Sequence, residues 1–171
     1  MLIHLIRHPR PLIEAGICYG QLDIDCEDPQ PVARQLASRL PENIPLLSSP
    51  LRRAKRLAEA LHADVRFDER LAEINFGDWE GCRWESIDRA ALDCWAADVL
   101  NFVPPGGESV AMLQARAVEF AAELESAQWS QVALVTHAGI MRALLGHLRQ
   151  LPADEWTRLK FDFGSVTTVE I

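Results

Sequence analysis

The 171-residue chain has no long apolar run, little glycine and little proline. Its 9 Gly and 10 Pro, with 49% hydrophobic and 25% charged residues, exclude the disordered and fibrous classes of protein. No stretch reaches the roughly 18 to 20 apolar residues of a membrane-spanning helix. The opening MLIHLIRH is too short for a signal sequence, because His4 and Arg7 interrupt it. We therefore expect one cytoplasmic domain over residues 1–171, with no membrane partner.

Basic residues are also scarce. The 17 Lys and Arg stand against 25 Asp and Glu, which gives a formal net charge of −8. Such a balance repels a polyanionic duplex, so nucleic acid is not an expected partner. A small anion can still bind, because a pocket acts through its local field rather than through the summed charge. The sequence carries no signal for an oligomeric state.

Cysteine is present without a recognisable pattern. The four cysteines, Cys18, Cys26, Cys82 and Cys94, form no C-x-x-C pair and no Cys/His spacing typical of a zinc site. We expect them to be reduced thiols. Since the chain also lacks a P-loop, we expect neither a metal nor a cofactor.

Aliphatic and β-branched runs alternate with helical patterns along the chain. The expected strands are 1–6, 44–49, 131–137 and 165–171, and the expected helices are 29–40, 50–62, 108–127 and 138–150. Strands followed directly by helices indicate βαβ units. The expected fold class is α/β, a three-layer α/β/α sandwich with a mostly parallel central sheet and helices on both faces.

Three of these strands end in residues that can carry chemistry. Their ends read LIRHP, LLSSPLRRA and LVTHAG, in segments far apart in the sequence. Because ligands gather at the carboxyl ends of parallel strands, we expect the three segments to converge on one site.

Each of these residues also has an ordinary interpretation. His8 can be a hydrogen-bonded structural histidine, and Arg7 a surface charge. His137 can cap the helix that follows it, where free N–H groups otherwise suit an anion. Arg52 and Arg53 fall in the first turn of a helix, where the dipole disfavours a cation. We expect one of these arginines to meet an anion and the other to face solvent.

The loop LAEINFGDWEG, residues 71–81, supplies a carboxylate. Glu73 lies among apolar neighbours that would desolvate it and favour its protonated form. A protonated carboxyl near neutral pH is what a leaving alkoxide needs. The alternative is that Glu73 faces solvent and that Trp79 belongs to the ordinary core.

The candidates together are two histidines, at least two arginines and one acid. Arginine forks match phosphate oxygens, and a neutral histidine can attack phosphorus. The set therefore predicts phosphoryl transfer without a metal, with a small-molecule phosphate ester as the partner.

The same segments resemble the histidine phosphatase superfamily, whose first strand ends in R-H-G. Arg7-His8-Pro9 takes that place, SSPLRRA resembles the second phosphate-binding segment, LAEINFGDWEG the acid-bearing loop and VTHAG the second histidine. PGGES (105–109) resembles the loop before a long helix, which Glu108 or Ser109 is expected to cap.

The resemblance implies a role for each candidate. His8 would be the nucleophile that becomes phosphohistidine, and Glu73 the proton donor to the leaving group and later the base for water. Arg7, Arg53 and His137 would hold the phosphoryl oxygens, which places His137 in both the catalytic and the phosphate-binding set.

The first loop departs from the family pattern. Pro9 replaces the glycine after the nucleophile, where it should hold His8 in an extended conformation and removes one backbone N–H. Glu14 stands where the family often has asparagine, and a carboxylate is a poor phosphate ligand because like charges repel. Tyr19, Gln21 or a backbone group of residues 16–23 can stand in for it.

The short length and the RHP…CYG..D pattern resemble the alpha-ribazole phosphatase branch of the superfamily, which acts in cobalamin nucleotide-loop assembly. The chain has little room for the inserted segments of phosphoglycerate mutases, so hydrolysis is favoured. Mutase-type phosphoryl transfer and a non-catalytic phospho-ligand binding module are the alternatives. Trp84, Trp95 and Phe102 can stack on a ring of the substrate or belong to the core.

Overall fold

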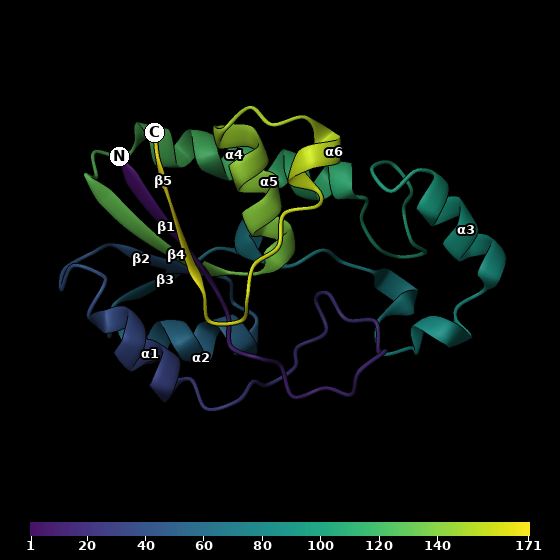
Figure 1. Cartoon of the computed structure of the whole chain (residues 1–171), viewed down its shortest axis with the longest axis horizontal. Helices are drawn as coiled ribbons and strands as arrows, with labels where there is room; N and C mark the ends of the chain where they lie inside the picture. The colour runs from purple at the N-terminus through teal and green to yellow at the C-terminus, as the bar shows by residue number, and fades with distance from the viewer.

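A computed structural model describes all 171 residues and contains one five-stranded sheet (Figure 1). The strands are β1 (Leu2–Arg7), β2 (Leu46–Ser48), β3 (Val65–Phe67), β4 (Gln131–Thr136) and β5 (Val166–Glu170). Their order is β3-β2-β4-β1-β5, in which only β5 runs antiparallel to its neighbour. The carboxyl ends of β1, β2 and β4 therefore lie at one edge of the sheet.

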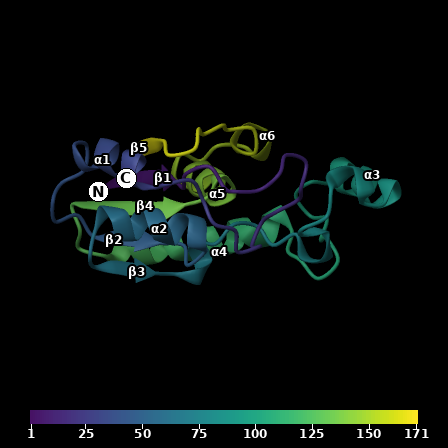
Figure 2. The ribbon, with the colours of Figure 1, turned by 90° about the horizontal axis from the view of Figure 1, so that it is seen from below.

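Helices cover both faces of this sheet. Helices α1 (Gln30–Ala37) and α2 (Arg52–Leu61) lie on one face, and α4 (Val110–Ser126), α5 (Ala138–Leu148) and the short α6 (Ala153–Trp156) on the other (Figures 1 and 2). The three-layer α/β/α architecture expected from the sequence is confirmed.

The alternation of side chains along β1 divides the core between these layers. Ile3 and Leu5 pack in the cluster beneath α4 and α5, whereas Ile6 packs in the cluster beneath α1 and α2. Successive side chains of a strand point to opposite faces, and both faces of β1 are covered. This is why its sequence is an aliphatic run rather than an apolar and polar alternation.

Several elements were not expected from the sequence. They are β3, α3 (Arg89–Ala97), α6 and three short 3₁₀ helices at Glu69–Leu71, Gly77–Trp79 and Trp84–Ser86. Strand β3 is a three-residue edge strand without a buried side chain, so it lacks an alternating pattern. Helix α3 also has no fully buried residue.

Residues 78–106, which we call the cap lobe, stand apart from the sheet. Both views place α3 at one end of the molecule (Figures 1 and 2). The lobe has its own small hydrophobic cluster around Trp79 and Ile87, joined by Cys18 of the first loop. Further aromatic residues pack against this cluster, namely Phe76, Trp84, Trp95 and Phe102.

The lobe is joined to the rest of the chain through two closely apposed glycines. A Cβ on Gly77 would lie 2.1 Å from the carbonyl oxygen of Pro105, and one on Gly107 would lie 2.4 Å from that of Asn75. Gly77 also has a positive φ of 56°, which favours glycine. The N–H of Asp78 donates to the Pro105 carbonyl at 2.8 Å, which holds the two segments side by side.

None of the helices combines the length and the apolar character that a membrane crossing requires. The four cysteines are free thiols, with Cys18 and Cys26 buried.

Candidate functional site

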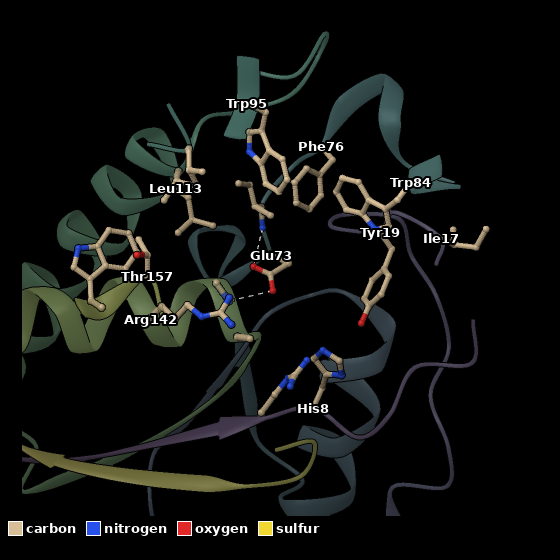
Figure 3. A pocket seen from close by; sticks show the side chains of 17 residues that line it. His8, Ile17, Tyr19, Glu73, Phe76, Trp84, Trp95, Leu113, Arg142 and Thr157 are labelled. Carbon is tan, nitrogen blue, oxygen red and sulfur yellow. Dashed lines mark hydrogen bonds between the residues drawn. The ribbon is translucent and has the colours of Figure 1, made fainter. Parts of the chain in front are cut away.

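A cavity of about 440 Å³ opens at the carboxyl ends of β1 and β4 (Figure 3). Arg7 ends β1 and His8 follows it, while His137 follows β4 directly. The two imidazole rings lie with their centroids 4.9 Å apart. The predicted convergence of LIRHP and LVTHAG is therefore confirmed, and Ser49 brings the third segment to the same place through its bond to His137.

His8 is buried and has one ring nitrogen engaged. Its Nδ1 lies 2.6 Å from the carbonyl oxygen of Pro9. Because a carbonyl can only accept, Nδ1 carries the proton and Nε2 carries a lone pair. Burial, followed by the charge of Arg53, lowers the pKa of His8 to about 3. At neutral pH this imidazole is uncharged and its Nε2 carries a free lone pair.

His137 occupies the N-cap position of α5, yet its side chain does not cap the helix. Its Nε2 lies 2.8 Å from Oγ of Ser49, and its buried Nδ1 has no partner. Burial, and then the charge of Arg53, hold the pKa of His137 well below its usual range. The alternative of a helix-capping histidine is wrong, and a second neutral imidazole lies beside His8.

Two arginines approach the histidines from different elements. Arg7 donates to the carbonyl oxygen of Phe161 at 2.7 Å, and its guanidinium carbon lies 3.8 Å from the ring centroid of Phe163. Arg53 is fully buried and donates to the carbonyl of Leu22 at 2.9 Å. The Nε atoms of both arginines are buried without a partner, and burial lowers the pKa of both. An anion bound between them would offset that burial.

Of these two arginines, Arg52 faces solvent as expected, whereas Arg53 does not meet the anionic side chain expected for the other. Arg52 is exposed and lies beside Asp23, which accepts its backbone N–H at 2.7 Å. Arg53 turns inward, but its donors meet carbonyl oxygens rather than a carboxylate. No acidic side chain therefore pairs with the buried guanidinium of Arg53.

Glu73 lines the cavity, so the alternative that it merely faces solvent is wrong. Its carboxylate accepts the N–H of Ile74 at 3.0 Å and that of Gly139 at 3.1 Å (Figure 3). Gly139 is the second residue of α5, and a Cβ there would lie 2.1 Å from Oε1 of Glu73. Only glycine lets the start of α5 approach the carboxylate this closely.

Arg116 of α4 holds the segment that carries Glu73. It donates to the carbonyl oxygens of Arg70 and Ala72 at 2.7 Å and to that of Glu73 at 3.0 Å. Glu108 pairs with Arg116 at 2.6 Å. No motif in the sequence marks this role, because an arginine in the middle of a long helix is usually solvated.

The expectation that Glu108 or Ser109 caps this helix is settled in favour of Ser109, which accepts the N–H of Met112 at 3.1 Å. Glu108 instead accepts the N–H of Asn75 at 3.0 Å. The start of α4 and the Glu73 segment are therefore one hydrogen-bonded unit.

The far wall of the cavity is aromatic. The rings of Trp84 and Trp95 stack with centroids 5.7 Å apart and planes 16° from parallel, and Phe76 meets Trp84 edge-on. Phe102 instead stacks on Trp79 inside the lobe cluster. Of the three aromatic residues left open by the sequence, two line the cavity and one belongs to the core.

The cavity also has walls that the sequence did not indicate. They are formed by Ile74, Val110, Leu113, Arg142, Trp156 and Thr157. Arg142 is one turn along α5 from Ala138, and Trp156 and Thr157 come from the short α6 region. No motif marks these positions, because helix packing and chain reversal bring them to the site.

The two buried histidines make the fold sensitive to acid. An unfolded histidine takes up its proton near pH 6.5, whereas burial and Arg53 lower the pKa of His8 to about 3. Between these values the unfolded state binds more protons, so we expect the free energy of unfolding to fall as the pH drops from 6.5 towards 3. Urea titrations at stepped pH measure this slope. It should become shallower in His8→Gln, and an equal slope in both proteins would contradict the prediction.

Comparison with known proteins identifies the family of the chain. The model of the histidine phosphatase superfamily (branch 1) matches residues 3–171. The chain is 36% identical over 172 residues to a glucosyl-3-phosphoglycerate phosphatase of Mycolicibacterium vanbaalenii, in an alignment that covers 89% of this chain and 76% of the relative. It is 27% identical over 134 residues to the adenosylcobalamin/alpha-ribazole phosphatase of Escherichia coli, in an alignment that covers 74% of this chain and 66% of the relative.

Among solved structures, the native mycobacterial glucosyl-3-phosphoglycerate phosphatase superposes with a TM-score of 0.85 at 31% identity, covering 98% of this chain and 88% of the other. The family model spans nearly the whole chain, and these relatives are named as phosphatases. The chain therefore belongs to the histidine phosphatase superfamily and is one of its phosphatases.

Proposed function

We propose that the protein hydrolyses phosphate monoesters through a phosphohistidine on His8. The lone pair of Nε2 attacks phosphorus, the ester P–O bond breaks, and Glu73 gives its proton to the departing alkoxide. The Glu73 carboxylate then takes a proton from water as the water oxygen attacks phosphorus. The N–P bond breaks, phosphate leaves, and both side chains return to their starting state.

The surrounding cations and donors would stabilise the charge of the transferring group. The Nε groups of Arg7 and Arg53 are buried without a partner, and the two positive charges would stabilise the phosphoryl oxygens of a bound ester. In the tautomer with its proton on Nδ1, His137 adds a third donor. Because these cations come from the chain itself, the proposal requires no metal.

One observation carries this proposal, namely the bond between His8 and the Pro9 carbonyl. It fixes the proton on Nδ1 and leaves Nε2 free beside two arginines. A structural histidine would use both nitrogens for hydrogen bonds, as His4 does with Thr168 and Gln131. The ring of His8 is held for attack instead.

The test is hydrolysis of a small aryl phosphate in excess chelator, with trapping of an acid-labile phosphoenzyme. We expect turnover and label without added metal. A strict requirement for a divalent cation, or turnover without any phosphoenzyme, would contradict the proposal. Incubation with 3-phosphoglycerate and a bisphosphoglycerate primer separates the alternatives, because a mutase would yield isomerised product and a binding module would yield none.

For the substrate, we propose a phosphate ester with a planar ring in its leaving group, such as alpha-ribazole 5′-phosphate. The stacked indoles of Trp84 and Trp95 offer a flat apolar wall, and 11 of the 17 residues lining the cavity are hydrophobic. An aromatic base gains from such a wall by stacking. The similarity to the Escherichia coli alpha-ribazole phosphatase supports the same choice.

A second substrate class is favoured by Arg142. Its Nε donates to the carbonyl oxygen of Leu159 at 2.7 Å, which fixes the guanidinium at the cavity wall. The salt bridges of the chain do not include Arg142, so its charge is free to meet a carboxylate. Esters with a carboxylate in the leaving group, such as glucosyl-3-phosphoglycerate, would use it, and relatives that act on that compound support this candidate.

Two variants separate the substrate classes. If the ring is recognised, Trp84→Leu should lower kcat/KM for alpha-ribazole 5′-phosphate about tenfold and leave small alkyl phosphates unaffected. If a carboxylate is recognised, Arg142→Gln should raise KM for glucosyl-3-phosphoglycerate alone. Steady-state kinetics on both esters and on a small alkyl phosphate give the answer, and an equal loss on all three esters would refute both assignments.

A further inference from the structure

The first loop lacks the asparagine of its family, and the structure shows where the replacing carboxylate goes. Glu14 points away from the site and pairs with Arg83 at 2.7 Å, and its side chain is 76% exposed. It does not line the cavity. The position that supplies a phosphate contact elsewhere in the family is therefore unused here.

Several other polar groups of this loop are already engaged. The side-chain amide of Gln21 donates to the carbonyl oxygen of Glu73 at 3.0 Å. The backbone N–H groups of Gln21 and Leu22 both donate to the carboxylate of Glu80. Asp23 accepts the N–H of Arg52. The side-chain amide of Gln21 and the N–H groups of Gln21 and Leu22 are therefore not available to a phosphoryl group.

Tyr19 differs from all of these because it lines the cavity together with Arg7 and His8. Figure 3 shows its ring descending from the first loop with the hydroxyl directed towards His8, and no hydrogen bond joins that hydroxyl to another labelled residue. The guanidinium carbon of Arg53 lies 5.5 Å from the ring centroid. The phenol therefore faces the space between the two arginines and the nucleophile.

The electrostatics agree with this placement. Burial lowers the pKa of Arg7, and the proximity of the Tyr19 oxygen is the largest effect that opposes this shift. Burial also lowers the pKa of Arg53, which Glu73 and then Tyr19 oppose. The phenol oxygen is thus close to both guanidinium groups at once.

The backbone around Tyr19 is fixed before any ligand arrives. A Cβ on Gly20 would lie 1.8 Å from the carbonyl oxygen of Ile74, so this glycine packs the loop directly against the Glu73 segment. Glu80 holds the two residues that follow. A donor held in this way loses little freedom when it meets a developing charge.

We propose that the Tyr19 hydroxyl donates a hydrogen bond to a phosphoryl oxygen, in place of the missing asparagine. This inference rests on the proposed phosphohistidine chemistry of His8. With this hydrogen bond, Tyr19 is a catalytic residue specific to this form of the first loop. Trp84 and Trp95, rather than the phenol ring, then form the wall that contacts the leaving group.

Tyr19→Phe tests the hydroxyl while keeping the ring. Removal of one such donor costs on the order of 10²-fold in kcat, and the inhibition constant of vanadate, a phosphate analogue, should rise in parallel. Glu14→Gln is the matched control, because that side chain faces solvent, and it should leave both values unchanged. If Tyr19→Phe retains wild-type kcat/KM and vanadate inhibition, the assignment is overturned.

A spectroscopic readout keeps the proposal testable if that variant folds poorly. Tyr19 is the sole tyrosine of the chain, so labelling with 3-fluorotyrosine gives a single ¹⁹F resonance. We expect inorganic phosphate to shift this resonance in the otherwise unaltered protein, at concentrations that inhibit turnover. A resonance that does not move at saturating phosphate would overturn the role of Tyr19, whereas absence of turnover and phosphoenzyme would overturn the chemistry of His8 instead.

Discussion

Replacement of His8 by alanine is expected to abolish phosphatase activity. The variant lacks the imidazole whose Nε2 is neutral and carries a free lone pair beside Arg7 and Arg53, so no phosphohistidine can form at this position. Loss of a nucleophile costs on the order of 10⁴-fold or more in kcat. Hydrolysis of an aryl phosphate gives the rate, and denaturing gels after a brief pulse of labelled substrate give the phosphoenzyme.

The control for this variant is a histidine outside the site. His62 is partly exposed and its Nδ1 accepts the N–H of Asp64 at 3.0 Å within its own turn. His62→Ala should keep both activity and label. If His8→Ala still hydrolyses the ester and still carries acid-labile phosphate, another residue is the nucleophile.

Glu73→Gln is expected to slow the enzyme by an amount that depends on the leaving group. General acid catalysis is worth about 10² to 10⁴ in rate, but only a poor leaving group needs the proton. The loss should therefore approach that range for alkyl phosphates and be small for nitrophenyl phosphate. Asp78→Asn changes a carboxylate nearby that does not line the cavity, and it should affect neither ester.

A second variant separates position from proton donation. In Gly139→Ala the new methyl group would fall 2.1 Å from Oε1 of Glu73 and must displace the carboxylate, which itself is unchanged. Gly139→Ala should therefore slow hydrolysis of alkyl phosphates more than that of nitrophenyl phosphate, as Glu73→Gln does, but by a smaller factor. Equal losses on alkyl and nitrophenyl esters in Glu73→Gln would contradict its role as the acid.

Much of the sheet could be predicted because the physics that shapes it is local. The runs 44–49, 131–137 and 165–171 contain β2, β4 and β5, and the run 1–6 matches β1 to within one residue at either end, since buried strands need continuous apolar or β-branched residues. Helices α1, α2, α4 and α5 follow the expected ranges to within three residues at either end. By contrast, β3 and α3 bury little, so their sequences record few of their contacts.

The convergence of Arg7, His8 and His137 could be predicted for a related reason. A parallel sheet delivers its strand ends to one edge, so Arg7, His8 and His137 meet whatever the loops do. The side of the cavity assigned to the leaving group could not be predicted, because it depends on packing between residues that are far apart in the sequence. Arg142 and Trp156 reach the cavity through helix placement. The sequence does not distinguish Tyr19 from Gln21, whose amide is engaged in the structure.

The two glycines at the base of the cap lobe bear on how such an enzyme can change its substrate. Because Gly77 and Gly107 bring the ends of residues 78–106 together, the segment resembles an insertion whose two junctions are adjacent in space. Trp84 and Trp95 lie within it, whereas His8, Arg53 and Glu73 lie outside it. Transplanting this segment between relatives, joined at the same glycines, would therefore exchange the recognition of the alcohol while the machinery for phosphorus stays in place.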